Sequence, residues 1–249
     1  MMRIIRSGLM NRIGPHRWDS HVLIAFLAFA LVSLGMIALA SEVAEGDTFA
    51  IDKMILTGLR HSDQAGLPIG PAWLSVAVAD LTSLGSAAVL VLITVFALGY
   101  LLVVDKKSNA MFVAASITGG ALLSGLLKAI LVRPRPEIVP HLVDVSSSSF
   151  PSGHSMNSAI VYLTLAVLLA RSEEDRHVQV YLIAVALTLT LIVGSTRVYL
   201  GVHWPSDVLA GWAVGAIWAA GCSLIARELQ RRGAIERPVE GPVDGHSGN

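Results

Sequence analysis

Long apolar stretches with little or no charge, separated by short polar segments, dominate the pattern of the chain. A helix needs about 20 apolar residues to cross the hydrocarbon core of a bilayer, which is about 30 Å thick. Six stretches approach or exceed that length: residues 22–40, 81–104, 110–132, 154–170, 178–196 and 206–226. Alternation with a period of two, which would indicate the strands of a membrane barrel, does not recur along the sequence. The pattern therefore predicts an all-α, polytopic membrane protein built on a bundle of six transmembrane helices.

The segments on the two sides of this bundle differ in positive charge. Cytoplasmic loops of membrane proteins carry an excess of Lys and Arg. One side holds twelve of the 18 basic residues: Arg3, Arg6, Arg12, Arg17, Lys106, Lys107, Arg171, Arg176, Arg227, Arg231, Arg232 and Arg237. The opposite side holds six: Lys53, Arg60, Lys128, Arg133, Arg135 and Arg197. The bias predicts a multi-pass protein of the cell membrane with both termini cytoplasmic and with residues 41–80, 133–153 and 197–205 on the extracytoplasmic side.

The ends of the chain need separate interpretations. We expect residues 1–20 to form a basic cytoplasmic tail and residues 21–228 the membrane domain. Residues 229–249 contain Gly, Pro and charge without periodicity, which predicts a disordered cytoplasmic tail. The first apolar stretch also resembles a secretory signal, because Ala38-Leu39-Ala40 before Ser41 has the form of a cleavage site. It is longer than the core of an ordinary signal, which favours a retained helix.

Apolar residues recur at roughly helical spacing within the first outer loop. Phe49, Ile51, Met54, Ile55 and Leu59 are spread among charged residues. Such spacing indicates a short amphipathic helix on the outer surface, and a linker without regular structure is the alternative.

Composition narrows the class of protein further. Hydrophobic residues make up 54% of the chain and charged residues 14%, where about 25% charged residues is usual in a soluble domain. These values disfavour a soluble globule, a disordered chain and a nucleic-acid-binding protein. Basic and acidic residues number 18 each, so any electrostatic function has to come from local clustering. The single cysteine, Cys222, excludes an intramolecular disulfide and a Cys-rich metal site.

Two polar motifs lie at predicted outer ends of helices. The first, K-A-I-L-V-R-P-R-P, contains Lys128 and Arg135, which taken alone would be interfacial charges with snorkelling side chains. The second, P-S-G-H, lies where a Ser-rich loop enters the fourth stretch. There Ser152 resembles a helix N-cap, and Gly153 lets a ligand approach the first backbone amides, which form a natural anion site. His154 would lie in the first turn, and taken alone it would be an ordinary polar residue at the interface.

A third polar motif lies at the start of the last stretch. It begins with Thr196 and Arg197 and continues with His203 and Asp207. Pro205 is compatible with the first turn of a helix, so we expect His203 and Asp207 to lie one turn apart on one face. Such a carboxylate accepts the Nδ1 proton of the imidazole and aims Nε2 outward as a nucleophile or base. A simple surface ion pair is the alternative for this motif in isolation.

Together the three motifs suit phosphoryl transfer. Cations and helix-start amides would hold phosphate oxygens and stabilise the charge spread over the transition state. One histidine would attack phosphorus, and the other would protonate the leaving oxygen. No cluster of residues has the spacing of metal ligands, so we expect neither a metal nor another cofactor.

The motifs K-x6-R-P, P-S-G-H and S-R-x5-H-x3-D are the signature of the type 2 phosphatidic acid phosphatase superfamily, which includes relatives of vanadium haloperoxidases. The sequence resembles this family from about residue 80 to residue 211. The resemblance implies that His203 becomes transiently phosphorylated, that His154 is the general acid and that Asp207 orients His203. It implies phosphate binding by Lys128, Arg135, Ser152, Gly153 and Arg197. It also implies a metal-free mechanism, six helices and an extracytoplasmic active site.

The chain departs from the family pattern at one position, where Thr196 replaces the usual serine. A threonine hydroxyl can still bond to phosphate, but its methyl group restricts the side-chain torsion. The catalytic set of two histidines and one aspartate is unaffected.

The expected function is therefore hydrolysis of a lipid phosphomonoester or diphosphate at the outer leaflet. Phosphatidic acid, phosphatidylglycerol phosphate and a polyprenyl diphosphate are the candidate substrates, and the expected partners are this amphiphile and the bilayer, without nucleic acid. A vanadate-dependent haloperoxidase is the enzymatic alternative, although those relatives are usually soluble. A non-catalytic lipid-phosphate carrier or transporter is the alternative from another class. Binding alone would not require His203, Asp207 and His154 together.

Overall fold

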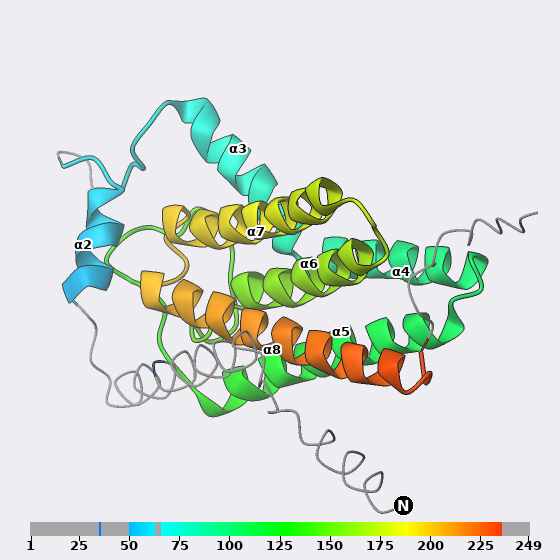
Figure 1. Ribbon diagram of the computed structural model, residues 1–249. Helices are drawn as coiled ribbons and strands as arrows, with labels where there is room; N and C mark the ends of the chain where they lie inside the picture. Colours follow the sequence, from blue (N-terminus) through cyan, green and yellow to red (C-terminus); the bar gives the residue numbers. More distant parts are fainter. Residues whose placement is uncertain (1–34, 36–49, 63–65, 236–249) are drawn as a thin grey trace, which may run out of the picture.

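The computed structural model describes Gly35, residues 50–62 and residues 66–235. The expected N-terminal tail, the first apolar stretch apart from Gly35, and the chain beyond residue 235 lie outside the described residues. Over the described residues the fold is helical and contains no named strand (Figure 1). The elements are α2 (Ala50–Gly58), α3 (Ala72–Thr82), the 3₁₀ helix η1 (Ser83–Gly85), α4 (Ala87–Val103), α5 (Lys107–Ile130), α6 (Gly153–Arg171), α7 (Arg176–Tyr199) and α8 (Pro205–Arg231).

Four of these helices, α5 to α8, are long and apolar enough to cross a membrane. A fifth crossing results if α3 with η1 and α4 form one broken span, whose two parts are bent by 48°. The prediction of helices in the last four apolar stretches is confirmed. The first predicted helix, residues 22–40, falls outside the described residues apart from Gly35, so the count of six and the cytoplasmic placement of both termini stay predictions.

The stretch at residues 81–104 was predicted to be one helix, and this prediction is wrong in its first turn. The last turn of α3 and η1 take up residues 81–85, and α4 begins only at Ala87. Ser86 causes the restart, because its side chain accepts a hydrogen bond from the Val89 amide at 3.3 Å and so caps a new helix. The break directs α3 away from the bundle axis (Figure 1).

Helix α6 is the centre of the bundle. It lies between α7 and α8 and also contacts α4 and α5 (Figure 1). Small residues on α8 allow a close approach to α6, as is common between membrane helices. A Cβ atom at Gly215 would lie 2.5 Å from the Cβ of Ala159, and one at Gly211 would lie 2.7 Å from the Ser152 carbonyl oxygen. The start of α6 is therefore held firmly against the start of α8.

The short helix predicted near residue 50 is confirmed as α2. It packs on the start of α8 through Leu56, which is fully buried against Val139 and Trp204. Asp52, one turn earlier on the same face, is also buried, whereas Ile51 and Met54 are exposed. The buried face of α2 therefore includes a carboxylate, which the hydrophobic pattern did not indicate.

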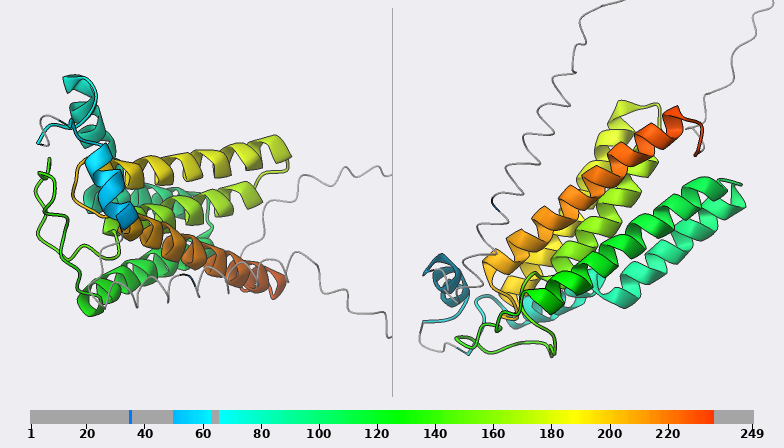
Figure 2. Two further views of the ribbon diagram at one scale, coloured as in Figure 1. Left: turned by 90° about the vertical axis from the view of Figure 1, so that its left-hand side faces the viewer. Right: turned by 90° about the horizontal axis from the view of Figure 1, so that it is seen from below.

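Helix α3 was not expected, because residues 41–80 were interpreted as an outer loop. It follows Pro71 and packs along α7. The Tyr199 hydroxyl, at the end of α7, donates to the Ile69 carbonyl at 2.8 Å and ties the segment before α3 to the bundle. The loops at residues 131–152 and 200–204 lie at the same end of the bundle as α2 (Figure 2). The described parts of the three outer segments predicted from charge therefore share one end of the molecule.

Candidate active site

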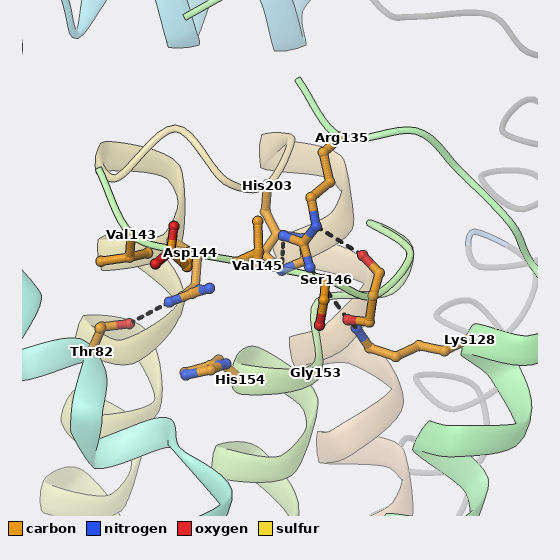
Figure 3. Close-up of a pocket in the computed structure, with 12 residues that line it drawn as sticks. Thr82, Lys128, Arg135, Val143, Asp144, Val145, Ser146, Gly153, His154 and His203 are labelled. Carbon is orange, nitrogen blue, oxygen red and sulfur yellow. Dashed lines mark hydrogen bonds between the residues drawn. The ribbon is translucent and has the colours of Figure 1, made fainter. Parts of the chain in front are cut away.

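A cavity of about 240 Å³ lies at this end of the bundle, where α5 and α7 end and α6 begins (Figure 3). Six of the eight predicted site residues line it: Lys128, Arg135, Gly153, His154, Arg197 and His203. The rest of the wall is Thr82 and the loop at residues 143–147. The structure thus brings together residues from all three motifs, as predicted. Asp207 and Ser152 lie behind this wall.

His203 and Asp207 form the pair that the sequence predicts. Pro205 is the first residue of α8, so His203 precedes the helix and Asp207 lies in its first turn. Nδ1 of His203 lies 3.4 Å from Oδ2 of Asp207. The same Oδ2 accepts the backbone amide of Trp204 at 2.9 Å and the hydroxyl of Ser149. The carboxylate is thereby fixed beside the imidazole.

The far nitrogen of His203 faces Arg135. Nη1 of Arg135 lies 3.3 Å from Nε2 of His203 and also donates to the Val202 carbonyl. A guanidinium can only donate, so Nε2 offers its lone pair and Nδ1 carries the proton that faces Asp207. Burial lowers the pKa of His203 to about 4, against the raising effect of Asp207. The imidazole is therefore neutral at pH 7, with an unprotonated nitrogen on the cavity side.

A buried ion-pair chain supports Asp207 from behind. Oδ1 of Asp207 accepts a hydrogen bond from Nη1 of Arg133 at 2.7 Å. Nη2 of Arg133 lies 3.1 Å from Oδ2 of Asp52. The Arg133 guanidinium also donates to the Ser206 hydroxyl at 2.8 Å and lies 5.4 Å from the ring centre of Trp204. Asp52 in turn accepts the Ser206 amide at 2.9 Å. Helix α2 is thus connected to Asp207 through Arg133.

Sequence reasoning missed three of these residues: Asp52, Arg133 and Ser149. Arg133 entered only as one of several outer charges. Asp52 and Leu56 are four residues apart, and this helical spacing was the signal that could have placed Asp52 on the buried face of α2. Ser149 belongs to the Ser-rich loop before α6, where nothing in the sequence distinguishes it from its neighbours.

Three cations converge on the cavity from different elements. Nζ of Lys128, in the last turn of α5, donates to the Ser147 hydroxyl and the Ser148 carbonyl, each at 3.2 Å. Arg135 donates from Nε to the Ser147 carbonyl at 2.8 Å. Burial lowers the pKa of Arg135, but a guanidinium stays charged at neutral pH.

The third cation, Arg197 at the end of α7, donates from Nη1 to the Thr82 hydroxyl at 3.1 Å, and its buried Nε has no partner among the described residues. Within the described ranges no carboxylate forms an ion pair with Lys128, Arg135 or Arg197. Asp144 adds one carboxylate to the wall, so the three cations leave a net positive cavity that suits an anion with several oxygens.

The start of α6 has the predicted N-cap. Ser152 accepts the Ser155 amide at 3.5 Å and the Ser155 hydroxyl at 3.0 Å. Its own backbone amide donates to the Asp207 carbonyl at 3.0 Å. Ser152 is fully buried by these contacts and does not line the cavity. Direct phosphate binding by its hydroxyl stays a prediction, and the amides of Gly153 and His154 are the first-turn donors nearest the cavity.

Two glycines leave room for the functional side chains. A Cβ atom at Gly153 would lie 3.0 Å from Cε of Lys128. A Cβ atom at Gly85, in η1, would lie 2.3 Å from Cγ1 of Val193 and 3.1 Å from Cδ2 of His154. Any larger residue at Gly85 would displace the ring of His154 or the wall of α7.

Thr196 uses its hydroxyl within α7. The hydroxyl donates to the Val193 carbonyl at 2.6 Å, and the side chain is buried outside the cavity wall. The departure from the usual serine therefore leaves the lining of the cavity unchanged.

Comparison with known proteins identifies a family. The model of the PAP2 superfamily matches residues 109–231. The chain is 34% identical to phosphatidylglycerophosphatase B of Bacillus subtilis over 62% of this chain and 76% of that protein. It is 31% identical to a lipid A 1-phosphatase of Rhizobium etli over 85% of this chain and 89% of the relative. The crystal structure of a transmembrane PAP2-type phosphatidylglycerolphosphate phosphatase from Bacillus subtilis superposes with a TM-score of 0.72 at 29% identity, covering 82% and 98% of the two chains.

Proposed function

Because the chain belongs to the PAP2 superfamily, we propose that it is an integral membrane phosphatase that hydrolyses lipid phosphomonoesters or diphosphates at the outer leaflet through a phosphohistidine intermediate. The relatives named above are lipid phosphatases, which supports the class of reaction. Phosphatidic acid, phosphatidylglycerol phosphate and polyprenyl diphosphates are the candidate substrates. The excess of Lys and Arg on the opposite side of the bundle supports the outer leaflet.

The observation that carries the proposal is the position of His203 Nε2. This atom is unprotonated and is backed by Asp207 through Nδ1. It faces a cavity with three cations that form no ion pair with the described carboxylates. A carrier would need the cations and the amides, but it would gain nothing from an oriented neutral imidazole. The arrangement therefore favours catalysis over binding alone.

In the first step, the lone pair of His203 Nε2 attacks phosphorus, and the bond from phosphorus to the lipid oxygen breaks. His154 lies across the cavity and donates a proton to that oxygen as it leaves (Figure 3). Lys128, Arg135 and Arg197 stabilise the negative charge on the three equatorial oxygens. Asp207 accepts the Nδ1 proton in a hydrogen bond and stabilises the positive imidazole ring.

In the second step, water attacks the phosphohistidine. His154, now deprotonated, takes the proton from the water, and the N–P bond breaks with its electron pair returning to Nε2. The products are inorganic phosphate, neutral His203 and protonated His154. All positive charge in this scheme comes from side chains, so we propose that the reaction needs no metal ion. Within the described residues, no three His, Cys, Asp or Glu side chains form a group that could hold one.

The test is phosphate release by the purified protein from a panel of lipid phosphates, with and without a chelator of divalent metals. Activity that survives chelation supports the scheme, and activity that is lost in chelator and restored by Mg²⁺ contradicts it. His203→Ala should abolish turnover. His177→Ala, which replaces an exposed histidine in the first turn of α7, is the matched control and should retain wild-type turnover.

The acidity of the leaving group distinguishes the roles of the two histidines in the first step. In His154→Ala, the pre-steady-state release of the leaving group should be severely slowed for an alkyl phosphate but much less for a nitrophenyl phosphate, because nitrophenolate needs little protonation. Equal losses in this first step with both substrates would contradict the role of His154 as general acid.

A further inference from the structure

A second cavity, of about 340 Å³, opens between α4, α5 and α6. Its wall is apolar almost throughout, with Leu90, Val91 and Val95 from α4, Ile117 from α5 and Ile160 from α6. The volume lies within the range of about 300–1,000 Å³ that small ligands occupy. Val91 and Val95 are 60% and 54% exposed, so the wall continues into the lipid-facing surface of α4. The cavity is thus suited to a hydrocarbon chain that enters from the bilayer.

Three polar side chains interrupt this apolar wall, Thr94, Thr118 and Asn157, and the hydroxyl of Thr94 is already bonded to the Leu90 carbonyl at 2.7 Å. Asn157 of α6 lines the cavity, and its Oδ1 is buried with no hydrogen-bond partner among the described residues. A buried amide oxygen without a partner is unfavourable, and an apolar residue at this position would avoid that cost. A carboxamide both donates and accepts hydrogen bonds, so it can bind an ester or an amide group.

Asn157 lies near the catalytic cavity along α6. It follows His154 by three residues on α6, so the two side chains share a face and are separated by about 4.5 Å along the helix axis. His154 lines the catalytic cavity, and Asn157 lines the apolar one. When the phosphate of a lipid lies beside His203, the lipid atoms that are two or three bonds from the leaving oxygen would therefore lie at the level of Asn157.

The candidate substrates differ at this level. Phosphatidic acid carries an acyl ester there, whereas phosphatidylglycerol phosphate carries a free hydroxyl group next to its terminal phosphate. A phosphorylated, N-acylated sugar, which is a further lipid phosphate, would carry an acyl amide. A polyprenyl phosphate carries only hydrocarbon, which would leave the carboxamide unpaired. A site built to hydrogen-bond a substrate group discriminates strongly against an analogue without that group.

We propose that the cavity between α4, α5 and α6 holds an acyl chain and that Asn157 hydrogen-bonds the ester or amide next to the phosphate. The inference rests on the proposed lipid phosphatase activity and makes it selective for lipid phosphates with an acyl ester or amide next to the phosphate over polyprenyl phosphates.

The experiment compares kcat/KM for dioleoyl phosphatidic acid, for its dialkyl ether analogue without the two carbonyl groups, and for a polyprenyl monophosphate. The wild-type protein should prefer the ester over the ether by at least tenfold, and over the polyprenyl monophosphate by more. Asn157→Leu, which keeps similar volume, should reduce the ester-to-ether ratio to about one. Gln179→Leu is the control. It removes a carboxamide from the first turn of α7, at the end of that helix away from the catalytic cavity, and should keep the wild-type ratio.

Because each ratio is taken within one variant, a general loss of activity cancels. If Asn157→Leu does not accumulate, Asn157→Ala makes the same comparison with a smaller side chain. A wild-type ratio near one, or an unchanged ratio in the variants, would overturn the inference while lipid hydrolysis itself stands. Absence of hydrolysis of every lipid by the wild-type protein would instead overturn the proposed function.

Discussion

Replacing Asp52 by Asn should destabilise the protein by about 3 kcal/mol, although Asp52 lies outside the catalytic cavity. Its carboxylate is 2% exposed and is paired with Arg133, which is 5% exposed. Breaking a buried ion pair by removing one partner costs about 3–5 kcal/mol, because the other charge stays buried. Arg133 keeps Asp207 as a second partner, at 2.7 Å, which places the expected loss at the lower end of that range.

The matched control is Asp105→Asn. Asp105 pairs with Lys107 at 3.0 Å, but the two side chains are 83% and 72% exposed. An exposed pair contributes about 0–1 kcal/mol. The same chemical change should therefore have little effect at this position.

The assay is thermal unfolding of both variants in detergent, followed by tryptophan fluorescence, because Trp204 lies beside Arg133. A loss of about 3 kcal/mol corresponds to a decrease in Tm of roughly 6–12 °C for a chain of this size. Asp105→Asn should stay within about 3 °C of the wild-type protein. Equal shifts in the two variants would refute the reasoning that Asp52 is part of a buried ion-pair chain.

Three further predictions concern the site and its orientation. NMR of histidine-labelled protein can assign the His203 resonance as the one that is lost in His203→Gln. This resonance should titrate near pH 4, because burial disfavours the charged ring. A midpoint at or above pH 6.5 would contradict the neutral nucleophile. Gly85→Val should reduce kcat at least tenfold by displacing the ring of His154, whereas Gly99→Val, at an open position on α4, should not; equal activities would refute the steric argument. A reporter fused after Gly201 should read extracytoplasmic and one fused after Arg232 cytoplasmic, and the opposite pattern would place the site on the inner leaflet.

The sequence predicted what depends on local periodicity and spacing. Helices α5 to α8 follow from uninterrupted apolar stretches, and the pair of His203 and Asp207 follows from one helical turn after Pro205. The excess of Lys and Arg on the other side of the bundle predicted that three helix ends lie on one side. The convergence of Lys128, His154 and Arg197 followed from that prediction. Each of these features is encoded within a few consecutive residues.

Other features depend on contacts between distant segments and could not be read from one stretch. The ion-pair chain from Asp52 through Arg133 to Asp207 joins residues that are separated by up to 155 positions in the sequence, and no local pattern predicts it. The burial of the Ser152 hydroxyl depends on how closely α8 approaches at Gly211. The apolar cavity at Asn157 arises from the spacing between α4, α5 and α6, which the hydrophobic pattern of each helix leaves open.

The central claim is that His203 carries the phosphoryl group, and rapid-quench trapping with a radiolabelled lipid phosphate tests it most directly. The account predicts a protein-bound label that is stable to base, labile to acid, and located on the peptide that contains His203. The label should be absent in His203→Ala. With a radiolabelled nitrophenyl phosphate as the donor, the label should persist longer in His154→Ala than in the wild-type protein, because this variant lacks the base for the second step. Retention of the label in His203→Ala, or turnover by the wild-type protein without any trapped label, would contradict the account.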